Sequence, residues 1–119
     1  MSSASEPDVS SLPFTAVVAH GPSGLRFVSG QIAERGVLDR DVVAQTASIF
    51  EKLRALLGSH GRTLQDVLRV GVFLVDMNDY DAFNTAYREH FKAPYPARTC
   101  VAVRALPLGA RVEMDVVVG

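Results

Sequence analysis

The sequence contains one cysteine, Cys100, and it lacks any long apolar run. With a single cysteine no disulfide can form within the chain, so the fold does not depend on an oxidising compartment. No segment approaches the roughly 18 consecutive apolar residues of a membrane-spanning helix, and the first residues lack the basic start and apolar core of a signal peptide. We therefore expect a cytoplasmic protein with no membrane partner.

The chain also lacks an excess of charge of either sign. The chain has 12 Lys and Arg residues against 13 Asp and Glu residues, and the basic residues are scattered along it. Nucleic-acid binding depends on neutralising phosphates, so nucleic acid is not an expected partner. The three histidines, His20, His60 and His90, lie far apart, and none has a cysteine or histidine at metal-ligand spacing. We expect no metal and no cofactor.

The size and composition indicate one soluble domain. The chain has 119 residues, of which 48% are hydrophobic and 21% are charged, and this profile leaves room for one core. Residues 1–11 are rich in serine and include Pro7, a composition that favours a mobile tail. The domain is therefore expected over residues 12–119.

Hydrophobic periodicity predicts the order strand, strand, long helix, strand, helix, strand, strand. The first two strands are expected to form a hairpin, and Thr63–Asp66 resembles a shortened capping box at the start of a single helical turn. In the second helix, Tyr80, Phe83, Tyr87 and Phe91 share one face, which we interpret as a core stripe. The expected ranges are 15–19, 25–29, 41–57, 67–75, 78 or 79 to 91, 98–103 and 112–118.

The central strand is apolar on both faces over Val70–Val75. A strand of this kind must be covered on both sides, and the chain supplies only two helices, which can cover one face of the sheet. The other face is then an apolar patch larger than monomers usually expose. This pattern predicts that subunits pack sheet against sheet.

The stretch from Tyr95 to Val118 carries the clearest chemical signal. Alternation places Arg98 and Cys100 on one strand face and Glu113 on the polar face of the last strand, and we interpret the two strands as an adjacent antiparallel pair. An arginine fork held on a strand suits a planar carboxylate. Pairing of Arg98 with an acidic side chain at the surface explains the residue equally well. A lone cysteine such as Cys100 more often packs as a small apolar residue than acts as a nucleophile.

These residues resemble the RidA/YjgF family of enamine and imine deaminases, also known as endoribonuclease L-PSP proteins. The run YPARTCV at Tyr95–Val101 is similar to the family's aromatic-Pro-Ala-Arg-Ser/Thr-Cys-Val signature, and VEMD at Val112–Asp115 follows at the family's distance. Supporting segments are residues 27–32, residues 72–79, and Asn84 within residues 83–87.

The resemblance implies an α+β, chorismate-mutase-like single domain whose mixed sheet carries two helices on one face. It also implies a homotrimer with a central barrel and clefts between subunits. In this family the arginine matching Arg98 binds the substrate carboxylate, and residues matching Ser29, Gly30, Asn84 and Glu113 line or support the cleft. The cysteine matching Cys100 lies close to the ligand.

The implied activity is hydrolysis of 2-aminoacrylate-type enamines and 2-imino acids to 2-keto acids and ammonia. This chemistry needs a carboxylate anchor, a positioned water and a proton carrier. We assign the anchor to Arg98 and activation of the water to Glu113, with no covalent role for Cys100. Many deaminases of the family carry a tyrosine where this chain has Phe14, so the ring that walls the cleft is kept while its hydroxyl is lost.

Three other functions remain open. A module that binds small carboxylates such as keto acids without turnover, or a redox-responsive chaperone, is compatible with the loss of the hydroxyl at Phe14. A ribonuclease has less physical support, because the sequence offers no basic groove and no histidine pair at plausible spacing.

Overall fold

A computed structural model of the chain describes residues 12–22 and 24–119. The expected mobile tail at residues 1–11 lies outside the described residues. Short 3-10 turns separate several of the elements. The strands and helices are β1 (Val17–Ala19), β2 (Arg26–Gln31), α1 (Val42–Gly58), β3 (Val67–Leu74), α2 (Tyr80–Arg88), β4 (Ala97–Ala102) and β5 (Val112–Val118).

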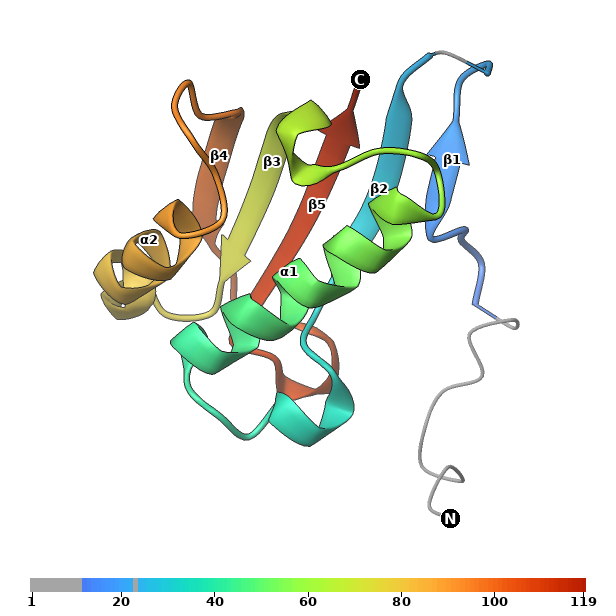
Figure 1. The fold of residues 1–119 in the computed structure, drawn as a ribbon. Helices are drawn as coiled ribbons and strands as arrows, with labels where there is room; N and C mark the ends of the chain where they lie inside the picture. Colours follow the sequence, from blue (N-terminus) through green and yellow to red (C-terminus); the bar gives the residue numbers. More distant parts are fainter. Residues whose placement is uncertain (1–11, 23) are drawn as a thin grey trace.

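The strands form one sheet in the order β1-β2-β5-β3-β4, and both helices pack on the same face of it (Figure 1). Only β3 and β4 run parallel, while the other neighbours are antiparallel. The predicted mixed sheet with two helices on one face is confirmed, as is the hairpin of β1 and β2. In the described segments no helix is long and apolar enough to cross a membrane.

The prediction that the last two strands are neighbours is wrong. The central strand β3 lies between them and pairs parallel with β4 and antiparallel with β5. Parallel pairing of β3 with β4 requires a crossover, and α2 supplies it. The backbone N–H and C=O groups along both edges of β3 are therefore paired within the sheet.

The helices begin where local chemistry places their caps. The side chain of Asp41 accepts a hydrogen bond from the Ala44 backbone N–H at the start of α1. The predicted capping box is present, because the Thr63 hydroxyl and the Asp66 carboxylate both accept backbone hydrogen bonds. The second helix is shorter than predicted, since α2 ends at Arg88 and not at Phe91.

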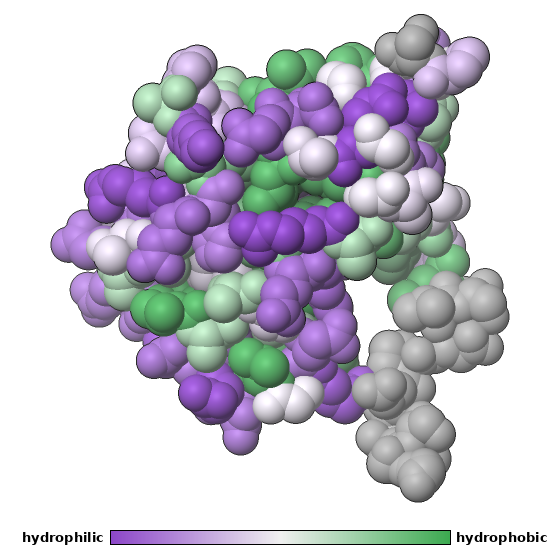
Figure 2. Space-filling view, in the orientation of Figure 1, coloured by the Kyte–Doolittle hydropathy of each residue, from purple (hydrophilic) through white to green (hydrophobic). Residues whose placement is uncertain are grey.

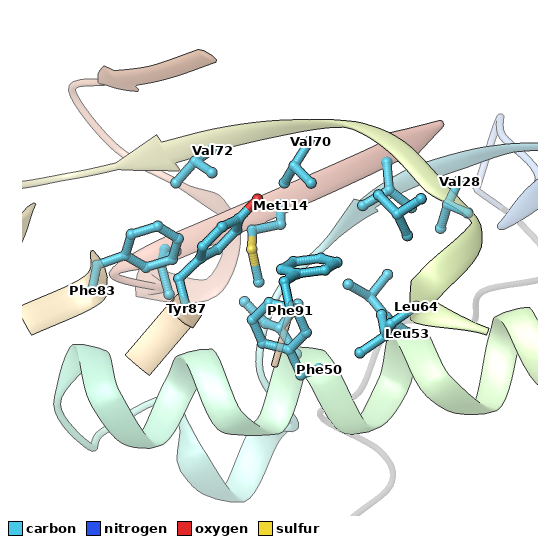
Figure 3. Close-up of a cluster of buried hydrophobic side chains, with 14 of the residues drawn as sticks. Val28, Phe50, Leu53, Leu64, Val70, Val72, Phe83, Tyr87, Phe91 and Met114 are labelled. Carbon is cyan, nitrogen blue, oxygen red and sulfur yellow. The ribbon is translucent and has the colours of Figure 1, made fainter. Parts of the chain in front are cut away.

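The core lies between the helices and the sheet (Figure 3). Phe50 and Leu53 of α1 contribute fully buried side chains, and Phe83 does so from α2. The expected core stripe of α2 is buried at Phe83, Tyr87 and Phe91, whereas Tyr80 is 38% exposed. The outer surface on the helix side is mostly hydrophilic, with separate small hydrophobic patches (Figure 2).

The opposite face of the sheet carries no helix in the part of the chain that the structure describes. On this open face Phe27 is 45% exposed and Val101 is 40% exposed. Glu113 and Asp115 of β5 also lie on this face, because Glu113 is in register with Phe73 and Val101. The predicted packing of subunits through this face stays a prediction.

Candidate functional site

Arg98 lies on β4 and projects to the helix side of the sheet, in register with Val70 of the core. Its guanidinium lies 4.8 Å from the centre of the Tyr87 ring, 5.6 Å from Phe83 and 5.8 Å from Tyr80. Its Nη2 atom also donates a hydrogen bond of 3.3 Å to the Tyr80 hydroxyl. Three aromatic residues spread along α2, from its first residue to its next-to-last, therefore hold this cation.

The ring contacts hold Arg98 without using its N–H groups, and only the Tyr80 hydroxyl takes one of them. Cation–π contacts act through the ring face, so the remaining guanidinium N–H groups stay available to a carboxylate, which they bind as a fork. Among residues 12–22 and 24–119, no acidic side chain forms an ion pair with Arg98. The alternative of an ordinary surface salt bridge is not seen in this part of the chain.

A pocket of about 230 Å³ opens beside Arg98. Two of its lining residues, Asn84 and Tyr87, carry buried polar atoms, Asn84 Oδ1 and the Tyr87 hydroxyl, that have no hydrogen-bond partner within the described protein. Buried polar groups are normally paired, so such atoms beside a cation favour a ligand site. The pocket is lined by Asn84, Tyr87, Arg88, Tyr95, Pro96 and Arg98.

The Tyr87 hydroxyl remains protonated at neutral pH. Burial raises its pKa to about 12, and the nearby positive charge of Arg98 only partly opposes this effect. The side chain is 4% exposed and packs against Phe50, Phe83 and Phe91. A neutral phenol of this kind can donate a hydrogen bond but does not supply negative charge.

Cys100 lies two residues beyond Arg98 on the same face, in register with Val72. It is half-buried and packs against the core. Burial raises the pKa of its thiol, with Arg98 acting in the opposite direction. Because the thiolate is the nucleophilic form, this environment favours the interpretation of Cys100 as a small apolar residue without a covalent role.

Glu113 lies on the open face of the sheet, against Gly30 of β2. A Cβ atom on Gly30 would overlap the Glu113 carboxylate, so glycine is what allows this close approach. Burial raises the pKa of Glu113, and the neighbouring charge of Asp115 raises it further. Asp115 itself accepts a hydrogen bond of 3.1 Å from the Gly71 backbone N–H.

One chain does not bring Arg98 and Glu113 together. Arg98 is in register with Val70 and, across β3, with Val116, so it faces the helices. Glu113 lies three residues from Val116 and alternates to the opposite face. A small ligand bound to Arg98 is therefore out of reach of Glu113 in the same chain.

The remaining predicted residues divide between the two regions. Asn84 lines the pocket with Arg98, while Gly30 lies beside Glu113. The Ser29 hydroxyl donates a hydrogen bond of 2.6 Å to the Thr15 carbonyl and so ties the N-terminal segment to β2. Phe14 is 60% exposed and is not among the residues that line the pocket.

Sequence reasoning missed the pocket roles of Tyr87 and Arg88. The apolar spacing places Tyr87 only in the core stripe, although a phenol on a buried helix face needs a partner for its hydroxyl. Arg88 follows Asn84 by one helical turn and lies on the same face of α2.

No three His, Cys, Asp or Glu side chains form a metal-binding group among the residues placed in the structure.

Comparisons with known proteins identify the same family that the sequence resembles. The family model described as "Endoribonuclease L-PSP" matches residues 5–119. The chain is 36% identical over 109 residues to Protein DfrA of Myxococcus xanthus, covering 88% of this chain and 83% of the relative. It is 33% identical over 97 residues to 2-iminobutanoate/2-iminopropanoate deaminase of Dermatophagoides farinae, covering 77% and 75% of the two chains.

A solved structure shares the fold closely. RidA from the Antarctic bacterium Psychrobacter sp. PAMC 21119 superposes with a TM-score of 0.81 at 29% identity, covering 91% of this chain and 89% of that one. The family match spans nearly the whole chain, and it agrees with the mixed sheet and with the signature around Arg98. The chain belongs to the endoribonuclease L-PSP family, the group that includes the RidA and YjgF proteins.

Proposed function

We propose that the protein hydrolyses reactive 2-imino acids, and the 2-aminoacrylate-type enamines that form them, to 2-keto acids and ammonia. The observation that carries this proposal is the guanidinium of Arg98, held on aromatic rings beside a pocket that no carboxylate of the described residues lines. The relative from Dermatophagoides farinae, named for the deamination of two short 2-imino acids, supports the reaction class.

In this proposal the substrate carboxylate binds the free N–H groups of Arg98. The Asn84 Oδ1 atom, which has no partner among the described residues, accepts an N–H of the imine. Water adds to the imine carbon while a proton moves to nitrogen, and the carbinolamine then loses ammonia as the C–N bond breaks. The anchor holds the reacting carbon near the water and the proton carrier. Positioning of this kind accounts for a large share of the rate enhancement in such reactions.

Glu113 is the proposed group that orients and deprotonates the water. Its raised pKa brings its basicity closer to neutrality, as suits a general base. Since Glu113 and Arg98 lie on opposite faces of one sheet, a second copy of the chain must supply it. The exposed apolar residues of the open face, Phe27 and Val101, support an assembly through this face, for which we propose a homotrimer with intersubunit clefts.

The test is turnover of freshly generated 2-iminopropanoate, followed by trapping of the remaining imine with semicarbazide. Wild type is expected to exceed the spontaneous rate, while Arg98→Ala and Glu113→Gln are expected to lose most of this excess. Light scattering and circular dichroism on each variant separate a lost site from a lost assembly. A wild-type rate no greater than the spontaneous reaction would contradict the proposal.

A second candidate is a small-carboxylate binding module without turnover. Phe14 favours it, because this chain lacks a hydroxyl at that position. Thermal stabilisation by pyruvate or 2-ketobutyrate that disappears in Arg98→Ala, together with no deamination, would select this function. The redox-responsive chaperone has less support, since burial raises the pKa of Cys100 and lowers its thiolate fraction.

We also propose that the protein is cytoplasmic, as expected from its single cysteine. Fractionation of cells that produce the untagged chain tests it, and recovery of the chain with a membrane or organelle fraction would contradict it.

A further inference from the structure

Arg88 is a second cation in the pocket of Arg98. It is the last residue of α2, its side chain is exposed, and it lines the pocket together with Arg98 and Asn84. Within the described segments, no carboxylate forms an ion pair with Arg88. Helical neighbours at i−4 and i−3, Asn84 and Thr85, carry no charge that could pair with it.

The lining of this pocket is therefore electrostatically one-sided. It includes two arginine residues, Arg88 and Arg98, and no acidic residue lines it among the residues that the structure describes. A basic residue in the last turn also interacts favourably with the helix dipole. That interaction explains the position of Arg88 on the helix but leaves its forked N–H donors unpaired, and two such forks favour two carboxylates.

Building on the proposed deaminase function, we propose that this pocket selects dicarboxylic 2-imino acids over monocarboxylic ones. Arg98 binds the carboxylate next to the imine, and Arg88 binds the carboxylate at the end of the side chain. Tyr95 and Pro96 supply ring surfaces for the carbon atoms between the two carboxylates. The preferred substrates are then the imino acids that correspond to acidic amino acids.

Location of the two arginines supports this division of roles. Arg98 is partly buried, lies on a strand and is fixed by the rings of Tyr80 and Tyr87. Arg88 is exposed at a helix end, so its long side chain can adjust to acids of different length. The rigid cation suits the invariant end of the substrate, and the adjustable cation suits the variable end.

The measurement compares product acids, since these are stable and carry the same carboxylates. Binding of 2-oxoglutarate and 2-ketobutyrate to the assembled protein is measured by calorimetry, and the ratio of the two dissociation constants is the readout. Wild type is expected to bind 2-oxoglutarate about tenfold more tightly. Arg88→Ala is expected to bring the ratio close to one, and Arg88→Lys to keep part of it.

A matched control removes a guanidinium from elsewhere. Arg40 is exposed near the start of α1 and does not line the pocket, so Arg40→Ala is expected to keep the wild-type ratio. The preference is also expected to shrink at high salt, because the Arg88 contact is exposed and screened. A parallel turnover series with 2-iminoglutarate, generated by an amino acid oxidase, is expected to show the same order of variants.

The outcomes separate this inference from the proposed function. If wild type shows no preference for 2-oxoglutarate, or if Arg88→Ala keeps the preference, the selection of dicarboxylic substrates is wrong. If 2-ketobutyrate still binds in an Arg98-dependent way in that case, the carboxylate anchor survives. If neither acid binds and Arg98→Ala has no effect on turnover, both proposals fail.

Discussion

The guanidinium of Arg98 lies 4.8 Å above the ring of Tyr87, whose hydroxyl is buried without a hydrogen-bond partner among the described residues. An aromatic ring thus takes the place that a carboxylate occupies in an ordinary arginine salt bridge. A carboxylate partner would compete with an anionic ligand, whereas a ring leaves the charge of the arginine uncompensated. The pairing explains how a cation can be held in place and still be free to bind an anion.

Tyr87→Phe tests which part of Tyr87 matters. The ring and its contact with Arg98 are kept, while a buried hydroxyl without a protein partner is removed. We expect the free energy of unfolding to stay the same or to rise by up to about 1 kcal/mol. Tyr87→Leu is expected to lower it by at least about 1 kcal/mol, because the cation–π and aromatic contacts are lost. Urea unfolding at fixed protein concentration measures both, and a marked loss in Tyr87→Phe would show that the hydroxyl is bonded.

The stability of the protein is expected to depend on pH through Glu113. Burial and Asp115 raise its pKa in the folded state, so the folded chain holds the proton more strongly than the unfolded chain. The contribution of this group to the free energy of unfolding is fully present below the ordinary pKa of glutamate. It is lost as pH rises through the raised pKa of the folded state. Glu113→Gln removes this dependence, and unfolding midpoints measured across that range are expected to be flatter for the variant.

The exposed Glu51 on α1 provides the control for that experiment. Glu51→Gln removes the same charge from a position away from the open face, and its pH profile is expected to follow that of wild type. A Glu113→Gln profile that keeps the wild-type slope would contradict the assignment to Glu113.

Gly30→Ala is expected to separate activity from stability. The added methyl group would overlap the Glu113 carboxylate, and this flexible side chain can move aside at a stability cost below about 1 kcal/mol. Deaminase activity is expected to fall by about 10- to 100-fold, because the proposed base is displaced. At Gly36 an added methyl group meets nothing within 4 Å, so the Gly36→Ala protein should keep the deaminase activity of wild type. Equal activity in the two variants would remove Gly30 from the site.

Leu108 has a backbone conformation that leucine rarely adopts. Its φ is 57°, its ψ is 24°, and its side chain is 53% exposed. A left-handed conformation is unfavourable for leucine and better tolerated by asparagine. Leu108→Asn is expected to raise the free energy of unfolding by about 0.5–1 kcal/mol, measured by urea titration. Leu108→Val, which is stiffer at Cβ, should lower it, and the opposite order would show that the loop relaxes.

The sequence was informative wherever local chemistry decides the structure. The apolar spacing of residues 41–57 predicted α1 to within a residue at each end, and Thr63 and Asp66 specified their capping box. Alternation also assigned Arg98 and Cys100 to one strand face correctly. These features depend on side chains a few residues apart, which a single sequence records directly.

The order of the strands in the sheet could not be predicted in the same way. Alternation gives the face of a side chain but not the strand that lies beside it, so the insertion of β3 between β4 and β5 was missed. The end of α2 was placed too late because Phe91 continues the apolar spacing and is buried, although it lies beyond the helix. Its burial comes from tertiary packing against Phe50 and Tyr87.

The pocket was predicted in part. Arg98 and Asn84 meet there, as the resemblance implied, while Arg88 and the buried hydroxyl of Tyr87 were found only in the structure. A tyrosine in a core stripe satisfies the hydrophobic pattern whether or not its hydroxyl has a partner. The pattern therefore hides the one property that connects Tyr87 to a site.

The placement of Arg98 and Glu113 on opposite faces has a consequence for mixtures of variants. In the proposed assembly each cleft takes its anchor from one chain and its base from a neighbour, so two inactive variants are complementary. Chains that carry only Arg98→Ala and chains that carry only Glu113→Gln, dissociated and reassembled together, would form some clefts with both wild-type residues. Activity that returns on mixing, from two preparations that have each lost most of it, would be the signature of a site divided between copies.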